Sequence, residues 1–553
     1  MTPGRLARIV ACTLTLSACG DAGETSTTSE TSSSSSTAAT TGAPTSTDPT
    51  TSPPDPSTTT SDTTSTSDTS SDTTEPIADD TTTSSTTDPT TTTEDPSTST
   101  TSTTTDTGTT GDADDACAIE HAPPVTQVDG LTAVPIDILD LSASVTIDAA
   151  TKSANATATL HFRVGPDAGS PLFDLRQVIV GAALDGDPID PILLKARDLG
   201  GGPGATMRVL NAPLLACSEH TLELTYKLQK PGSPESKDLV WEGQTTRVKW
   251  DSWNTDLWPG RYLEAWFPAN LIFDRFPFDL DITLSNSQVP HLLATNGALE
   301  IPDDHHWQIS YPPSFTALSP MFVLVAADRV ETSTVIVDLV DDTKLTLELW
   351  RDLDSATDLP TFQSALQLSF DTFIPQVGPY AHGDRFVGYA WNDPGRSMEY
   401  DGATTTILEA ADHELFHSWW GRSIKPATQN DGWIDEAWDM HSVTIGFNET
   451  PIDFMDDPIT LSSQNPWVRI TPDAAYDTGE RVFAGIAAMV GTAELQLVMR
   501  TFYAEHTGEL VTTAQLERYL FCSLGEPGVR AVFHRFVYGQ FGDPAAPPPD
   551  YCD

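Results

Sequence analysis

The sequence feature that most constrains the fold is a short pattern of histidine and glutamate in the last quarter of the chain. His413, Glu414 and His417 lie within the run HELFH. On an α-helix, residues four apart lie on one face, so both imidazoles can reach one metal ion with Glu414 beside them. Neutral imidazole suits Zn²⁺, and a catalytic zinc needs a third protein ligand. Glu436 follows His417 after eighteen intervening residues. The pattern therefore predicts one Zn²⁺ per chain.

The amino terminus has the composition of an export signal. Residues 1–19 carry two arginines, then an apolar stretch, and end in Leu-Ser-Ala-Cys. This order is typical of a bacterial lipoprotein signal peptide. We expect cleavage before Cys19 and a lipid on that cysteine, which would anchor the protein in the bacterial cell envelope, at the outer membrane or the cell surface. The alternative is an ordinary secretory signal with an incidental cysteine, and both interpretations predict export.

Residues 20–115 consist largely of Ser, Thr, Asp and Pro. A segment with so little apolar surface cannot offset the entropy lost on ordering. We expect it to be a disordered stalk between the lipid anchor and the folded part of the chain.

The formal net charge is −51, and acidic residues continue through the part after the stalk. Nucleic acid and anionic membrane surfaces attract basic proteins and repel one of this charge. The composition therefore argues against nucleic acid as a partner and restricts the expected membrane contact to the lipid on Cys19.

Four cysteines remain once the signal is removed and Cys19 carries lipid. In an exported protein they indicate two disulfides, for which three pairings are possible. We favour Cys117–Cys217 and Cys522–Cys552, because each pair then lies within one predicted domain.

Residues 116–330 read as β structure. Apolar and polar residues alternate with the strand period in the runs 155–164, 221–226 and 278–284, and turn residues separate them. Helical periodicity is scarce, so we predict an all-β, sandwich-like amino-terminal domain.

The pattern changes near residue 331. Further strands are followed by helical spacing at 359–374, by a metal-binding helix predicted from about Thr404, and by a largely helical last third. A strand-bearing lobe followed by a helical lobe, with zinc ligands at their junction, favours a thermolysin-like α+β metallopeptidase domain over 331–553.

The metal pattern and its surroundings resemble the gluzincin aminopeptidases, typified by aminopeptidase N and leukotriene hydrolase. The spacing of HExxH and Glu436 is similar to that of the family. Weaker matches follow in the family's order across about 140–545. They are AWFP at 265–268, SPMFVLVA at 319–326, GPY at 378–380 and FVYGQFGDP at 536–544. The resemblance implies an aminopeptidase that acts on peptide substrates.

The resemblance also implies a role for each candidate residue. The zinc ligands would be His413, His417 and Glu436. Glu414 would be the general base that deprotonates a zinc-bound water and passes the proton to the leaving amine. Tyr476 would donate a hydrogen bond to the oxyanion.

A further implied residue is Glu399, which would bind the free α-amine of the substrate. It lies in RSMEY, where the family has GAMEN, so Arg396 and Tyr400 replace a glycine and an asparagine. An arginine at 396 could neutralise Glu399 and weaken the preference for a free amine.

Two alternatives to an aminopeptidase remain open at this point. The first is a zinc endopeptidase with an altered amine site, and the second is a non-catalytic surface binding protein. Asp439 and His441 follow Glu436 on its predicted helix. Each could orient a ligand imidazole, or lie on a solvated face.

Overall fold

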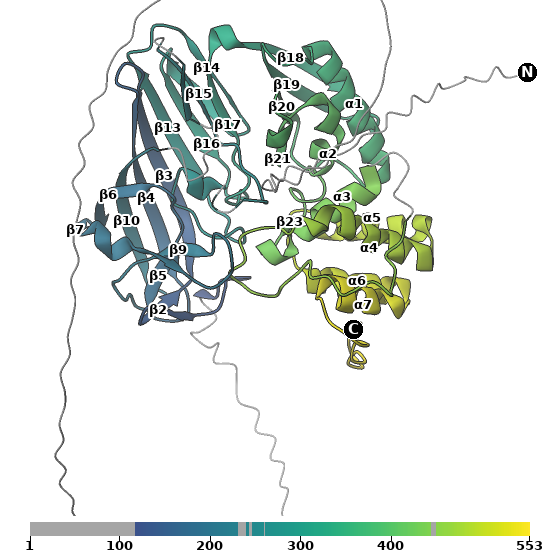
Figure 1. Cartoon of the computed structure of the whole chain (residues 1–553). Coiled ribbons are helices and arrows are strands. Elements are labelled where there is room, and N and C mark those ends of the chain that lie inside the picture. The colour runs from purple at the N-terminus through teal and green to yellow at the C-terminus, as the bar shows by residue number, and fades with distance from the viewer. Residues whose placement is uncertain are drawn as a thin grey trace, which may run out of the picture. The chain divides into compact units, whose positions relative to one another are not determined.

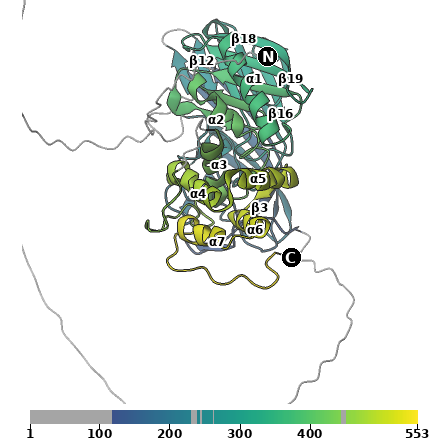
Figure 2. The same cartoon turned by 90° about the vertical axis from the view of Figure 1, so that its right-hand side faces the viewer.

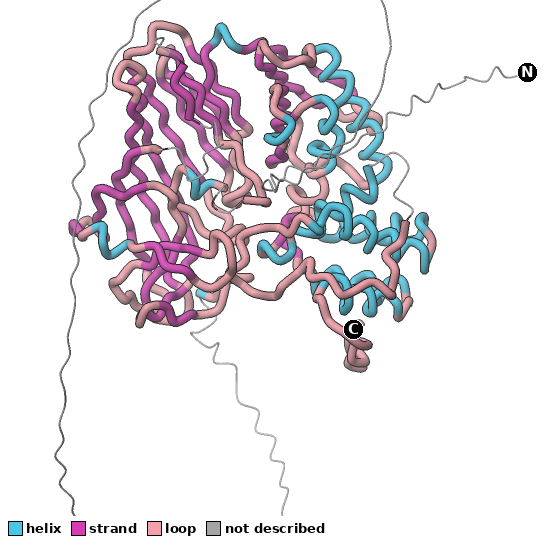
Figure 3. Tube along the Cα trace, in the orientation of Figure 1, coloured by secondary structure: helices cyan, strands magenta, loops and turns pink. Residues whose placement is uncertain are grey.

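The computed structural model describes residues 117–229, 239–242, 246–258, 260, 262–443 and 450–552. The predicted signal, Cys19 and the predicted stalk lie outside the described residues. Thr110–Asp553 form one compact unit. Within it, strands dominate the earlier part of the chain and helices the later part, as a comparison of the colours of Figures 1 and 3 shows.

The first part of the described chain contains an eight-stranded sheet with the order β15-β16-β13-β3-β4-β10-β6-β7. Its β13 and β3 run parallel, whereas the other neighbours run antiparallel. Alternate residues of β4 are buried, as the period of two predicts. The strands are β3 (Ile136–Asp148), β4 (Ser153–Val164), β6 (Val178–Leu184), β7 (Asp187–Ile189), β10 (Glu219–Lys227), β13 (Phe278–Ser285), β15 (Ala298–Asp303) and β16 (His306–Tyr311).

Two smaller sheets complete this β-rich part, with the orders β1-β2-β5-β9-β8 and β11-β12-β17-β14. Apolar residues of all three sheets join one core, so the β-rich prediction for 116–330 is realised with three sheets instead of two. The strands are β1 (Thr126–Val128), β2 (Leu131–Val134), β5 (Ser170–Phe173), β8 (Ala196–Asp198), β9 (Thr206–Val209), β11 (Leu239–Glu242), β12 (Arg247–Asp251), β14 (His291–Thr295) and β17 (Phe322–Ala326).

A five-stranded sheet follows, with the order β18-β19-β20-β22-β21. It contains β18 (Val330–Asp338), β19 (Lys344–Asp352), β20 (Arg385–Ala390), β21 (Met398–Tyr400) and β22 (Ala403–Thr406). The long helix α1 (Leu359–Gln376) connects β19 to the parallel strand β20. The edge strand β21 pairs antiparallel with β22 and carries Glu399.

The helix predicted to bind the metal is shorter than the sequence analysis indicated. Thr404 lies in β22, and the helix α2 covers only Ala411–Phe416. The β-branched threonines of Ala403–Thr406 pair with both β20 and β21, and this pairing prevails over a continuous helix.

The remaining helices pack around one apolar core with α1 and α2. They are α3 (Trp433–Val443), α4 (Ala474–Val490), α5 (Thr492–His506), α6 (Thr513–Leu524) and α7 (Gly528–Val532). Figures 1 and 2 show α3 to α7 gathered in one group below α1 and α2. A capping box fixes the start of α6, because Thr512 and Gln515 exchange hydrogen bonds there.

Both favoured disulfides, Cys117–Cys217 and Cys522–Cys552, are confirmed. Among the described residues, no single helix is long and apolar enough to cross a bilayer, although the bent pair α4–α5 together meets the criteria of length and composition.

Candidate metal centre

The helices α2 and α3 bring three nitrogen and oxygen donors to one point. The Nε2 atoms of His413 and His417 lie 3.3 Å apart. The Oε2 atom of Glu436 lies 3.4 Å from the first of them and 3.5 Å from the second. Donors bound tetrahedrally to Zn²⁺ at about 2.0–2.1 Å are separated by about 3.3–3.4 Å. The three predicted ligands therefore fit a zinc ion without rearrangement.

The other ring nitrogen of each histidine has its own partner. The Nδ1 of His413 contacts a carboxylate oxygen of Asp439, which is fully buried. The Nδ1 of His417 lies 3.1 Å from the carbonyl oxygen of Trp420, to which it can donate. Protons on both Nδ1 atoms leave the Nε2 lone pairs directed at the metal position. Of the two roles left open for Asp439, orientation of a ligand is the one this contact supports.

His441 has a different environment. It is buried, and its ring lies 5.5 Å from that of Trp438. Of the two roles considered for it, lying on a solvated face is the one that this burial contradicts.

We expect the contact with Asp439 to contribute to zinc affinity. An Asp439→Asn variant keeps the shape of the side chain and loses the charge, so zinc should bind about 10–100-fold more weakly. Competition with a chromophoric chelator measures this affinity. Asp473→Asn is the matched control, since Asp473 is exposed at the start of α4 and makes no side-chain cap. Equal zinc affinity in all three proteins would contradict the role of Asp439.

Glu414 lies on α2 beside the donors and is buried. Burial raises the pKa of its carboxyl well above the usual value, and the charge of Glu399 adds to the rise. A divalent cation held by the three donors would oppose this effect and favour the carboxylate form. The carboxyl of Glu414, the predicted general base, therefore lies in a buried environment that raises its affinity for a proton.

Tyr476 comes to the same point from α4. Its hydroxyl donates a hydrogen bond to Oε1 of Glu436 at 2.8 Å. Burial, followed by the charge of Glu436, raises the pKa of this phenol well above its usual value. Tyr476 is thus protonated at neutral pH and can act as a hydrogen-bond donor beside the metal position.

Glu399 also reaches the centre, but its cationic partner is not the predicted one. One carboxylate oxygen accepts a hydrogen bond from Nη2 of Arg422 at 2.6 Å. The expectation that Arg396 neutralises Glu399 is wrong, because Arg396 pairs with Asp251. The guanidinium of Arg396 lies 4.9 Å and 4.5 Å from two tryptophan ring centres, those of Trp253 and Trp391.

Sequence reasoning missed Arg422 and one further residue, Asp256. Asp256 lies in the loop after β12, and its carbonyl oxygen accepts the backbone N–H of Thr471 at 3.0 Å. Burial and then the charges of Glu436 and Glu399 raise the pKa of Asp256 well above its usual value. Its carboxyl therefore belongs to the same electrostatic environment. Arg422 lies within the stretch 413–436 that the sequence singled out, whereas no sequence signal marked Asp256.

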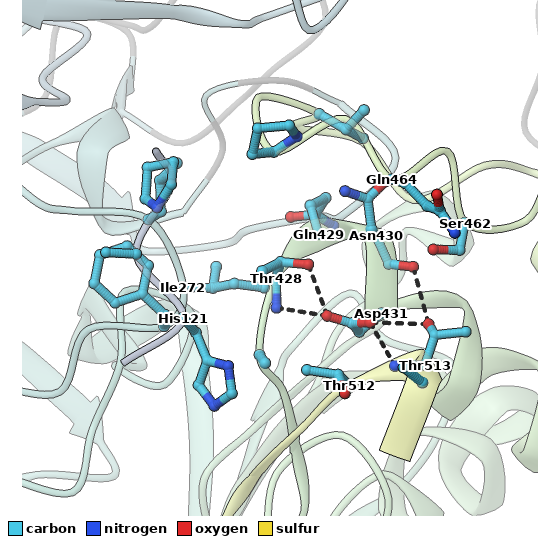
Figure 4. Close-up of a pocket in the computed structure, with 18 of the residues that line it drawn as sticks. His121, Ile272, Thr428, Gln429, Asn430, Asp431, Ser462, Gln464, Thr512 and Thr513 are labelled. Atoms are coloured by element: carbon cyan, nitrogen blue, oxygen red, sulfur yellow. Dashed lines mark hydrogen bonds between the residues drawn. The ribbon is translucent and has the colours of Figure 1, made fainter. Parts of the chain in front are cut away.

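A separate cavity of about 310 Å³ lies beside the turn that leads into α3 (Figure 4). This turn, η7 (Gln429–Asp431), lines it together with His121 and Ile272 of the β-rich part. The carboxylate of Asp431 accepts the backbone N–H of Thr513 at 2.6 Å, so it is engaged within the protein. Among the described residues that line the cavity, none belongs to the donor set. We therefore place the candidate site at the metal centre.

Several solved zinc metallopeptidases have a similar fold. The M1 zinc metallopeptidase of Deinococcus radiodurans aligns with a TM-score of 0.52 and 16% identity, over 75% of this chain and 96% of that one. Aminopeptidase A of Legionella pneumophila, in complex with aspartic acid, aligns with a TM-score of 0.55 and 12% identity, over 75% of this chain and 51% of that one. The fold is that of the M1 zinc metallopeptidases.

Leukotriene A4 hydrolase of Saccharomyces cerevisiae aligns with a TM-score of 0.50 and 14% identity, over 74% of this chain and 69% of that one. No protein-family model and no curated protein matches the sequence. The fold expected from the gluzincin resemblance is thus similar to that of these solved structures, although their identities to this chain are only 12–16%.

Proposed function

We propose that the chain is a zinc-dependent peptidase that hydrolyses peptide bonds at the amino terminus of its substrates. The observation that carries the proposal is the donor triangle of His413, His417 and Glu436, with sides of 3.3–3.5 Å, beside the buried carboxyl of Glu414. When bound, Zn²⁺ supplies a Lewis acid that polarises a carbonyl and acidifies water.

The protein's own residues would carry the remaining chemistry. Glu414 accepts a proton from the attacking water and delivers it to the leaving amine. Tyr476 donates a hydrogen bond from its hydroxyl to the oxygen of the scissile carbonyl as negative charge develops there, in place of its present bond to Glu436. Buried surroundings strengthen both interactions, because little water is present to screen them.

Glu399 is the proposed receptor of the substrate's amino group, through the carboxylate oxygen that does not bond to Arg422. A zinc endopeptidase is the second candidate function, and the ion pair of Glu399 with Arg422 is the observation that favours it. A non-catalytic binding protein is the third, and the retention of Glu414 beside a complete donor set argues against it. Export and anchoring through a lipid on Cys19 remain part of the proposal.

The proposal is tested with the zinc-loaded full chain and peptides whose amino termini are free. We expect one zinc per chain and hydrolysis of aminoacyl arylamides. A chelator should lower the rate to below about 1% of the starting value, and added Zn²⁺ should restore it. Cleavage confined to interior bonds of longer peptides would favour the endopeptidase. Stoichiometric zinc without hydrolysis of any peptide would favour the binding protein.

A further inference from the structure

Both side chains of the ion pair between Arg422 and Glu399 are buried. The side chains are 2% and 6% exposed, and Nη2 of Arg422 donates to a carboxylate oxygen at 2.6 Å. Nη1 donates to the carbonyl oxygen of Gly421 at 2.9 Å, and Nε lies 3.4 Å from the carbonyl oxygen of Glu399. All three guanidinium nitrogens thus have an acceptor, and these contacts hold the Arg422 side chain in its position beside Glu399.

This pair lies directly at the metal centre. One donor atom each from Glu399, His417 and Asp435 lies within 4.8 Å of the other two. Arg422 lies five residues after His417, in the loop that follows α2. The carboxylate best placed to meet a substrate amine therefore already has a permanent cation as its neighbour.

The charge of Arg422 changes how Glu399 would recognise the amino group of a substrate. A substrate ammonium that binds beside the Glu399 carboxylate would also be repelled by the Arg422 guanidinium, which offsets part of the attraction. Because Arg422 already pairs with Glu399, the binding of a neutral amino-terminal group does not leave a buried carboxylate unpaired. An unpaired carboxylate would weaken the binding of such a group. Both effects reduce the discrimination between charged and neutral amino termini.

We propose that Arg422 is a specificity-determining residue that relaxes the requirement for a free α-amine, so that peptides with neutral, blocked amino termini are substrates as well. This inference rests on the proposed peptidase function. It names the substrate class of the same site: peptides with a free amino terminus together with N-acylated peptides.

The first test compares an aminoacyl arylamide with its N-acetyl twin, using the zinc-loaded full chain. We expect the two values of kcat/KM to differ by less than about tenfold. A preference for the free amine above about 100-fold would overturn the inference while leaving the peptidase function intact. If neither of the two substrates is hydrolysed, the proposed peptidase function is wrong. Measurements of binding then test the role of Arg422. Titration calorimetry with an amino-acid amide and its N-acetyl derivative should then give Kd values within about tenfold.

Two variants separate Arg422 from its surroundings. Arg422→Met removes the cation and should raise the preference for the free amine, in kcat/KM and in Kd, by at least about tenfold. Arg396→Met is the matched control, because this second buried arginine pairs with Asp251 and not with Glu399. We expect the control to leave the ratio unchanged. An Arg422→Met ratio equal to that of the control would contradict the inference.

Loss of Arg422 leaves Glu399 without its buried partner, so the first variant could fail to fold. The double variant Glu399→Gln with Arg422→Met avoids this problem, because it removes both charges and leaves neither buried without its partner. If Arg422 already offsets the charge of Glu399, the double variant should keep the ratio of free to acetylated substrate within about tenfold of that of the unaltered chain. A selective loss of about 100-fold on the free amine would show that Glu399 dominates amine recognition, and the inference would be wrong.

Discussion

Replacing Glu414 with glutamine is expected to lower kcat by about 10²–10⁴-fold while the chain still binds one zinc ion. The amide has the shape of the carboxylate but cannot accept a proton from water. The zinc donors lie on His413, His417 and Glu436, so the metal should be retained. Steady-state kinetics on a free peptide substrate measures the rate, and metal analysis of the purified variant measures the zinc content.

The matched control is Glu409→Gln, a change of the same kind at an exposed position just before α2. We expect its kcat to equal that of the unaltered chain. A Glu414→Gln variant with unchanged kcat would show that another group takes the proton. A variant without zinc would show that Glu414 supports the fold of the centre instead of the chemistry.

The donor set could be predicted because its chemistry is local in sequence. His413 and His417 share a helical face by virtue of their spacing, whatever surrounds them. Glu436 was predicted from the separation alone, and the structure brings its carboxylate within 3.5 Å of both rings. The start of α2 could not be predicted as well, because the pairing of β22 with two neighbouring strands decides it, and helical spacing does not reveal that pairing.

The electrostatic surroundings could not be read from spacing. Arg396 is three residues from Glu399 in sequence, yet it contacts Asp251 of the β-rich part, 145 residues away. The actual partner of Glu399 is Arg422, 23 residues further on. Helical or strand periodicity predicts which residues share a face of one element. It does not predict which of several arginines a buried carboxylate meets after several elements have packed together.

Replacing Arg469 with methionine is expected to cost about 3–5 kcal/mol of unfolding free energy, because it leaves two buried carboxylates without their shared cation. Arg469 donates to Asp174 and to Glu264 at 2.9 Å each, and all three side chains are less than 5% exposed. Since Asp174 and Glu264 belong to the β-rich part and Arg469 precedes α4, the network connects the β-rich part to the helix that carries Tyr476.

The loss of unfolding free energy in the Arg469→Met variant should depend on pH. Burial raises the pKa of Glu264, and Arg469 is the strongest influence that lowers it. Without Arg469 the folded-state pKa rises further above that of the unfolded chain, so the variant is least penalised when Glu264 is protonated and loses stability as pH increases. Urea unfolding should therefore show a larger deficit at pH 8 than at pH 5. Arg329→Met, which removes a largely exposed pair with Glu242, is the control and should cost below about 1 kcal/mol at both values. An equal deficit for Arg469→Met at both values would contradict the predicted role of Glu264 in the pH dependence, and a deficit as small as that of the control would show that the network does not hold these two parts of the chain together.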